Sequence, residues 1–232
     1  MRASTLVQWG AIALVFIITI LAVQGIGGFV VSGGSGFSDL RTETPAGTAA
    51  CSGLGYGGFY QDYLSSPQSF ERRIGEWTFT INPVFKYTVV GKVIGKDEYP
   101  LVAADALAPM DLAIANGDIL SPDLFSRFTF SKTPRHYHYQ YYFPAGTRQL
   151  SSSYISEHIS NNHMIFANDA VYTTAKTVMV GDFIRMTGYL TTVNGKTPDG
   201  RTYFQGTSTT RTDTGEGACE VMYVESIEKF SC

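Results

Sequence analysis

The chain has 232 residues, of which 44% are hydrophobic and 16% are charged. This length allows one domain of moderate size, or one domain with an anchoring segment. Seventeen basic side chains against twenty acidic ones give a formal net charge of −3, so the basic surface that nucleic-acid binding requires is missing. Fifteen Phe and fourteen Tyr supply enough core-forming side chains to exclude disorder for most of the chain.

An uncharged apolar segment near the N-terminus predicts where the protein resides. A helix over Leu6 to Val31 would be about 39 Å long at ~1.5 Å per residue, which spans a hydrocarbon core of ~30 Å with some tilt. We therefore expect residues 1–31 to form a retained single-pass membrane anchor. The positive-inside rule then places Arg2 in the cytoplasm and the body of the protein on the extracytoplasmic side. The alternative is a cleaved signal peptide with Ala13 to Val23 as its apolar region.

Residues 32–75 are predicted as an arm or linker, because their first half is rich in Gly, Ser, Thr and Ala. An extracytoplasmic β domain is expected over residues 76–232. Its first strands are Trp77 to Ile81, where apolar and polar residues alternate, and Phe85 to Ile94 beyond the interrupting Pro83.

Two helices are expected next, over Asp111 to Ile119 and over Ser121 to Phe128, where Ser121 suits the N-cap and Pro122 the first helical position. A second series of strands is predicted at Phe128–Phe143, Met164–Phe166, Asp182–Val193, Tyr203–Thr210 and Glu220–Ile227, with turns at Asn194-Gly195 and Asp199-Gly200. These elements predict a mainly β fold, either a small antiparallel OB-like barrel or a sandwich, with one or two short helices.

Several segments between Pro109 and Ile227 resemble a group of uncharacterised, membrane-anchored exported proteins of bacteria and archaea. The likeness rests on Pro109–Ala113, Arg135–Tyr139, Asn162–Ile165, Gly181–Leu190 and Arg211–Glu220. The resemblance implies an anchored, exported domain. It assigns no catalytic residue, because the group has no assigned activity.

All four histidines of the chain lie within 28 positions, at His136, His138, His158 and His163. On a strand, His136 and His138 point to the same face. Two imidazoles at that spacing could share one metal ion, with His158 or His163 as a third ligand and Glu157 nearby. This pattern motivates a zinc or copper site. The alternative is that the histidines cover the polar face of a tyrosine-rich strand.

Five charged residues that lie beside apolar strand residues form a candidate polar core or ligand pocket. They are Asp111, Arg135, Arg211, Asp213 and Glu220. Buried charges are tolerated when they are paired and hydrogen-bonded, so a structural ion-pair network is the alternative. A serine-hydrolase triad of Ser160, His163 and Asp111 is also conceivable, although nothing in the sequence joins these three residues.

A dense run of aromatic residues suggests an interaction surface at Tyr137, Tyr139, Tyr141 and Tyr142. The alternative is a half-buried strand core. Together with the anchor and the lack of a recognisable catalytic set, this run favours a non-enzymatic interaction module or an accessory subunit of a membrane complex, with a protein partner in or on the membrane. The alternative function is an exported protein, including an enzyme, that binds a metal or small ligand through its clustered histidines.

Three cysteines permit one disulfide. Cys219 and Cys232 bracket a predicted strand that carries the chain about 26 Å at ~3.3 Å per residue. Too few residues then remain for a return to the ~5.5 Å Cα separation of a disulfide. Cys51 on the arm can reach either partner, so we expect Cys51–Cys219 or Cys51–Cys232 in an oxidising compartment.

Overall fold

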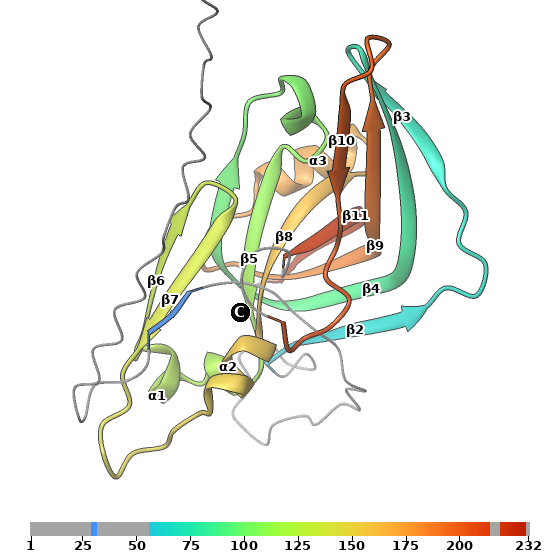
Figure 1. Cartoon of the computed structure of the whole chain (residues 1–232). Helices are drawn as coiled ribbons and strands as arrows, with labels where there is room; N and C mark the ends of the chain where they lie inside the picture. Colours follow the sequence, from blue (N-terminus) through green and yellow to red (C-terminus); the bar gives the residue numbers. More distant parts are fainter. Residues whose placement is uncertain (1–28, 32–55, 214–218, 231–232) are drawn as a thin grey trace, which may run out of the picture.

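The computed structural model describes residues 29–31, 56–213 and 219–230, and within them the chain is mainly β (Figure 1). The strands are β1 (Phe29–Val31), β2 (Gly58–Tyr63), β3 (Phe70–Ile74), β4 (Trp77–Glu98), β5 (Met110–Ala115), β6 (Phe128–Thr133), β7 (His136–Tyr141), β8 (Ile159–Phe166), β9 (Phe183–Lys196), β10 (Thr202–Gln205) and β11 (Glu220–Phe230). The helices are α1 (Pro122–Phe125), α2 (Ser152–Glu157) and α3 (Asp169–Lys176), and the 3-10 turns are η1 (Ala103–Ala106) and η2 (Gly117–Leu120).

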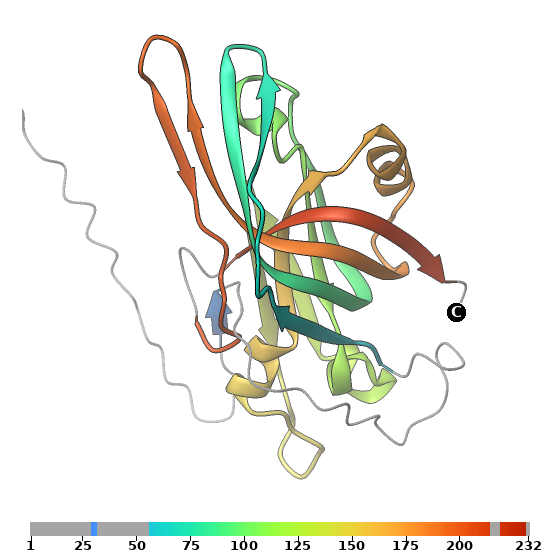
Figure 2. The ribbon, with the colours of Figure 1, turned by 90° about the vertical axis from the view of Figure 1, so that its right-hand side faces the viewer.

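Eight strands form one sheet, which is not a clean barrel. Five of its strands nevertheless close into a hydrogen-bonded ring in the order β4–β5–β8–β11–β9–β4, because the long strand β4 pairs with both β5 and β9. We call these five strands the ring. Strands β8 and β11 run parallel, and the other neighbours in this ring are antiparallel. Strands β2, β3 and β10 lie outside the ring, and Figure 2 shows the β3–β4 and β9–β10 pairs extending beyond it.

The ring encloses the largest hydrophobic core, because the side chains of each strand point alternately inward and outward. Leu112 of β5, Met164 of β8, Met186 of β9 and Met222 of β11 all point inward and are buried. Helix α3 adds Ala175 to the same core. The residues that alternate with these on β5, β8 and β11 therefore face outward.

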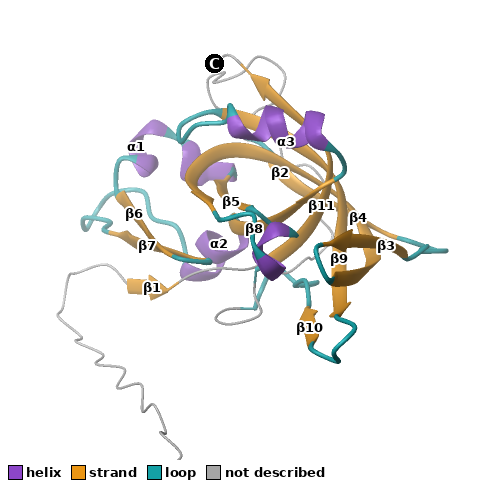
Figure 3. Ribbon diagram, turned by 90° about the horizontal axis from the view of Figure 1, so that it is seen from above, coloured by secondary structure: helices purple, strands orange, loops and turns teal. Residues whose placement is uncertain are grey.

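A second sheet, made of β1, β7 and β6, packs against the outer face of the ring (Figure 3). The β6–β7 hairpin approaches β4 closely at Gly95, where a Cβ atom would lie 2.0 Å from the ring of Tyr137. Because residue 95 is a glycine, Tyr137 can be buried there and can donate a hydrogen bond to the carbonyl of Ile94. This packing brings the tip of the hairpin to the outer face of β5 and β8.

The mainly β class predicted from the sequence is confirmed. The two strands expected around Pro83 are one strand, since β4 continues through this proline with only a shift of register between Pro83 and Phe85. The helix predicted over 111–119 is wrong, because residues 110–115 form the central strand β5. All six of its residues are buried between neighbouring strands, and this tertiary environment overrides the helical propensity of Met, Leu and Ala.

Other predicted boundaries also shift. Pro122 begins α1 as expected, but the helix ends at Phe125. The turn expected at Asn194-Gly195 is wrong, because β9 continues to Lys196, whereas the chain turns around Asp199-Gly200 as expected. Strand β8 begins at Ile159, five residues before the predicted start at Met164.

The N-terminal predictions fall mostly outside the described residues. Residues 1–28 of the expected anchor and 32–55 of the expected arm are not described, whereas Phe29–Val31 pair with β7. Across the described ranges, none of the helices has the length and apolar character needed to span a bilayer. The last part of the expected arm differs from a linker, because it contains β2 and β3, which both pair with β4.

A buried ion pair lies inside the ring where β11 begins. Arg211 Nη1 donates to Glu220 Oε1 at 2.7 Å, and each side chain is only 2% exposed. The guanidinium also donates to the carbonyls of Glu157 at 3.0 Å and Ile159 at 3.1 Å, and it lies 3.6 Å from the ring centroid of Phe59. The pair therefore fixes the segment after β10 to the start of β11.

Replacing Glu220 with Leu should lower the free energy of unfolding by about 3–5 kcal/mol, because Arg211 would remain buried without its charge partner. Glu228→Leu is the matched control, since Glu228 lies on the same strand and pairs with Arg185 at 3.2 Å where both side chains are partly exposed. That variant should lose no more than about 1 kcal/mol. Guanidinium denaturation measures both, and equal losses would contradict the structural importance of the buried pair.

Candidate functional site

The register of β5, β8 and β11 brings four polar side chains to the outer face of the ring. Asp111 on β5 lies directly opposite His163 on β8, and Ala113 lies opposite Asn161. Asn161 and His163 are two residues apart, so they point to the same side. Cys219 immediately precedes β11, whose Glu220 pairs with Asn162, and it therefore lies beside Asn161.

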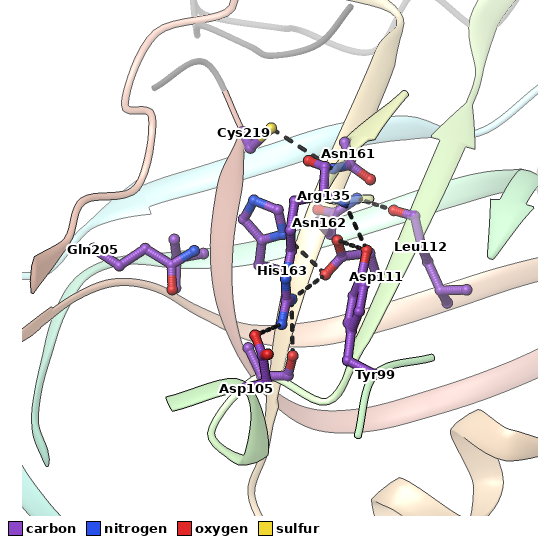
Figure 4. A network of polar contacts seen from close by, with 12 residues as sticks. Tyr99, Asp105, Asp111, Leu112, Arg135, Asn161, Asn162, His163, Gln205 and Cys219 are labelled. Atoms are coloured by element: carbon purple, nitrogen blue, oxygen red, sulfur yellow. Dashed lines mark hydrogen bonds and ion pairs between the residues drawn. The ribbon is translucent and has the colours of Figure 1, made fainter. Parts of the chain in front are cut away.

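The imidazole of His163 lies between the Asp111 carboxylate and the Cys219 sulfur (Figure 4). Nδ1 is 2.9 Å from Asp111 Oδ1. This distance is that of an ion pair. The carboxylate oxygen does not lie along the N–H bond, so the contact does not have the geometry of a linear hydrogen bond. The opposite side of the ring faces Cys219, with which the imidazole interacts. Asp111 and His163 are buried, whereas Cys219 is half-buried.

Two further side chains hold the Asp111 carboxylate in place. Tyr99 Oη donates to Oδ2 at 2.8 Å, and Arg135 Nη1 donates to Oδ1 at 3.0 Å. The guanidinium of Arg135 stacks on the Tyr99 ring at 3.6 Å and also donates to Asp105 at 2.7 Å and to the carbonyl of Ala108 at 2.9 Å. Both oxygens of the buried carboxylate are thus bound, which fixes its orientation toward His163.

Arg135 enters the site from the turn between β6 and β7. Its φ of 64° lies in the left-handed region, an uncommon conformation for a residue other than glycine. In this conformation its N–H donates to Tyr99 Oη at 2.9 Å, and its carbonyl accepts from Asn161 Nδ2 at 3.2 Å. The same Asn161 nitrogen lies 3.6 Å from Cys219 Sγ. Arg135 therefore contacts two members, Asp111 and Asn161, of the cluster of Asp111, His163, Asn161 and Cys219.

The electrostatics of the cluster favour a protonated His163. Burial by itself lowers the pKa of His163, but the Asp111 carboxylate and the Cys219 sulfur outweigh this effect and raise the pKa to about 9. The imidazole therefore carries a positive charge at neutral pH.

The structure separates the four histidines that suggested a metal site. His136 and His138 lie on the exposed side of β7, where Thr133 Oγ1 contacts His138 Nε2 at 3.0 Å. His158 stacks on Tyr154 at 3.8 Å, and burial lowers its pKa, whereas His163 joins Asp111. Among the described residues, no group of three or more His, Cys, Asp or Glu side chains is arranged to hold a metal ion.

The five charged residues expected in one polar core occupy separate places. Asp111 and Arg135 meet on the outer face of the ring, and Arg211 and Glu220 meet inside it. Asp213 accepts a hydrogen bond from Ser208 Oγ at 2.8 Å, in the segment between β10 and β11. The expected cluster is therefore two ion pairs on opposite faces of the sheet and one local contact.

The tyrosines of the predicted interaction surface point in different directions. Tyr137 and Tyr139 are buried between the hairpin and the ring, Tyr141 is half-buried and Tyr142 is 49% exposed. The first two therefore serve as core residues.

The disulfide prediction lies largely outside the described residues, because neither Cys51 nor Cys232 is described. Cys219 has no disulfide partner among the described residues, and its sulfur lies beside His163 and Asn161.

Of the triad suggested by the sequence, Asp111 and His163 meet, whereas Ser160 does not join them. Ser160 points into the ring, where its Oγ accepts from Asn162 Nδ2 at 2.9 Å, so it is on the opposite face from His163. The contributions of Cys219, Asn161 and Tyr99 were missed. The sequence indicated Cys219 only as a disulfide partner, and no motif singled out Asn161 or Tyr99.

No protein-family model, curated protein or solved structure matches this chain.

The raised pKa of His163 predicts a pH-dependent stability. Protonated His163 stabilises the fold fully below the pKa of an unfolded histidine, about 6.5, and this contribution is lost as the pH rises through about 9. The melting temperature of the native chain should therefore fall more between pH 6.5 and pH 9.5 than that of His163→Gln. Thermal melts across this range measure it, and two parallel curves would refute the assigned protonation.

Proposed function

We propose that this protein is a cysteine-dependent enzyme in which Cys219 is the nucleophile, His163 the acid–base residue and Asp111 the residue that orients His163. The observation that carries the proposal is the position of the His163 imidazole between the Asp111 carboxylate and the Cys219 sulfur. A nucleophile, a base within reach of it and a third group that orients the base are the recurring parts of such sites.

The burial of the three side chains supports this assignment of roles. Asp111 and His163 are 3% and 6% exposed, so water does not compete for their contact. Cys219, by contrast, is half-buried. Reactive cysteines combine such partial exposure with a nearby positive charge, whereas structural cysteines are buried in apolar surroundings.

The surrounding contacts are those of a preorganised site. Tyr99 and Arg135 bind both oxygens of Asp111, and Arg135 is itself bound by Asp105 and Ala108. Because these donors are fixed by the fold, the histidine does not need to be reoriented when a substrate binds. A simple structural ion pair does not require a half-buried cysteine on the far side of the imidazole.

We therefore propose a cysteine-dependent enzyme in place of the interaction module that the sequence predicted. The module rested on the membrane anchor, on the lack of a recognisable catalytic set and on a surface of tyrosines, of which Tyr137 and Tyr139 are buried. Location on the outer side of a membrane remains a prediction from residues 1–31, and so does membership of the resembling group of exported proteins.

We also propose that the five-stranded ring is an OB-like barrel with added strands. Its cyclic order β4–β5–β8–β11–β9, the parallel β8–β11 pair and the position of α3 between β8 and β9 support this assignment. The fold by itself does not identify a function.

The proposal predicts rapid alkylation of Cys219 by iodoacetamide at pH 6.5. Iodoacetamide reacts with the thiolate, and a positive charge next to the sulfur, here that of His163, makes a cysteine more reactive by about tenfold. In the reduced full-length chain, Cys219 should therefore react about tenfold faster than in His163→Gln, as measured by peptide mass spectrometry over time.

His158→Gln is the matched control, because His158 is a partly buried histidine that contacts Tyr154 rather than the cysteine. It should leave the alkylation rate of Cys219 unchanged. The proposal fails if His163→Gln reacts as fast as the native chain, or if the non-reduced protein contains Cys219 in a disulfide with Cys51 or Cys232.

A further inference from the structure

The fold fixes the orientation of the Asn161 side-chain amide. One of its N–H groups donates to a backbone carbonyl, and the other points to the sulfur of the proposed nucleophile. Asn161 is 4% exposed. Its Nδ2 donates to the Arg135 carbonyl at 3.2 Å and lies 3.6 Å from Cys219 Sγ. A side-chain amide nitrogen carries two protons, so both of these contacts can be made at once.

The Arg135 carbonyl excludes the flipped amide. If Oδ1 and Nδ2 of Asn161 changed places, two carbonyl oxygens would face each other, and neither can donate. The carbonyl itself cannot turn away easily, because the N–H and the guanidinium of Arg135 are bound by Tyr99 and Asp111. The nitrogen of Asn161 therefore stays on the side of the sulfur.

A fixed donor beside a sulfur nucleophile indicates the class of substrate. When a thiolate attacks a carbonyl carbon, the negative charge moves to an oxygen that is two bonds from the sulfur. A donor that reaches the sulfur can reach this oxygen with little movement, and such preorganised donors are what lowers the barrier of acyl transfer. Attack on a disulfide or at a saturated carbon creates no oxyanion and gains less from this donor.

On the basis of the proposed cysteine nucleophile, we infer that the substrate is an acyl compound, an ester, thioester or amide, and that Asn161 donates to its oxyanion. The Cys219 thiolate forms the S–C bond while the C=O electron pair moves to oxygen. The oxyanion then re-forms the carbonyl, the bond to the leaving group breaks, and the leaving group takes the proton of the His163 imidazolium. Neutral His163 next takes a proton from water, which attacks the thioester and releases the acid and the thiolate.

Two reagents separate this inference from the function on which it rests. p-Nitrophenyl acetate acylates a thiolate through an oxyanion, whereas iodoacetamide alkylates it by displacement at a saturated carbon without one. Both require the ionised Cys219, but only the first requires a donor to a developing oxygen charge. The ratio of the two rates in the same protein therefore reports on Asn161 alone.

Asn161→Leu removes the donor while retaining a similar side-chain volume. We expect the acylation rate of Cys219 by p-nitrophenyl acetate to fall about 100-fold or more, the loss typical of removing one oxyanion donor. The alkylation rate by iodoacetamide should change less than about threefold, because the thiolate and His163 remain. Acylation is measured as the 42 Da mass increase of the Cys219 peptide in the full-length chain.

Asn82→Leu is the matched control, since Asn82 Nδ2 likewise donates to two acceptors, the carbonyls of Thr80 and Thr192, away from the site. It should leave both rates unchanged. Asn161→Gln should restore part of the acylation rate, which a merely structural role would not produce. Equal losses of acylation and alkylation in Asn161→Leu, or unchanged acylation, overturn the inference. Slow alkylation of Cys219 in the native chain overturns its assignment as the nucleophile.

Discussion

The pairing register of three central strands, β5, β8 and β11, determines both the core and the cluster around His163. Asp111 and His163 can meet only because they are direct partners across β5 and β8. Side chains alternate along a strand, so a slip by one residue would turn His163 into the core and replace it with Asn162 or Met164. Every residue of both strands is buried, and this burial on both faces specifies the register strongly.

The opposite orientations of Cys219 and Glu220 follow from this register. Glu220 points into the ring and is held there by Arg211, which also binds two backbone carbonyls of the α2–β8 connection. Because adjacent residues of a strand face opposite sides, this inward ion pair directs the preceding Cys219 outward, toward His163. A charged pair that looks purely structural thus contributes to the geometry of the site on the other face of the sheet.

The hairpin of β6 and β7 supplies the remaining support from outside the ring. It packs through Tyr137 and Tyr139 and places Arg135 in the left-handed region at its turn. The strain of that backbone conformation is offset by contacts to Tyr99, Asp111 and Asn161. An uncommon backbone conformation that coincides with converging polar groups is a feature often found at functional sites.

The fold class and most of the strands were predictable from the sequence, because alternation of apolar and polar residues is a local signal. Prediction from the sequence failed at β5, where a fully buried strand shows no alternation and reads as a helix. It also identified Asp111 and His163 as separate candidates, yet paired them with Ser160 rather than Cys219. Which of these residues meet could be seen only in the folded structure. Strand pairing brings Asp111 and Cys219 close together, although they are far apart along the chain. The register between distant strands is not specified by any local pattern in a single sequence.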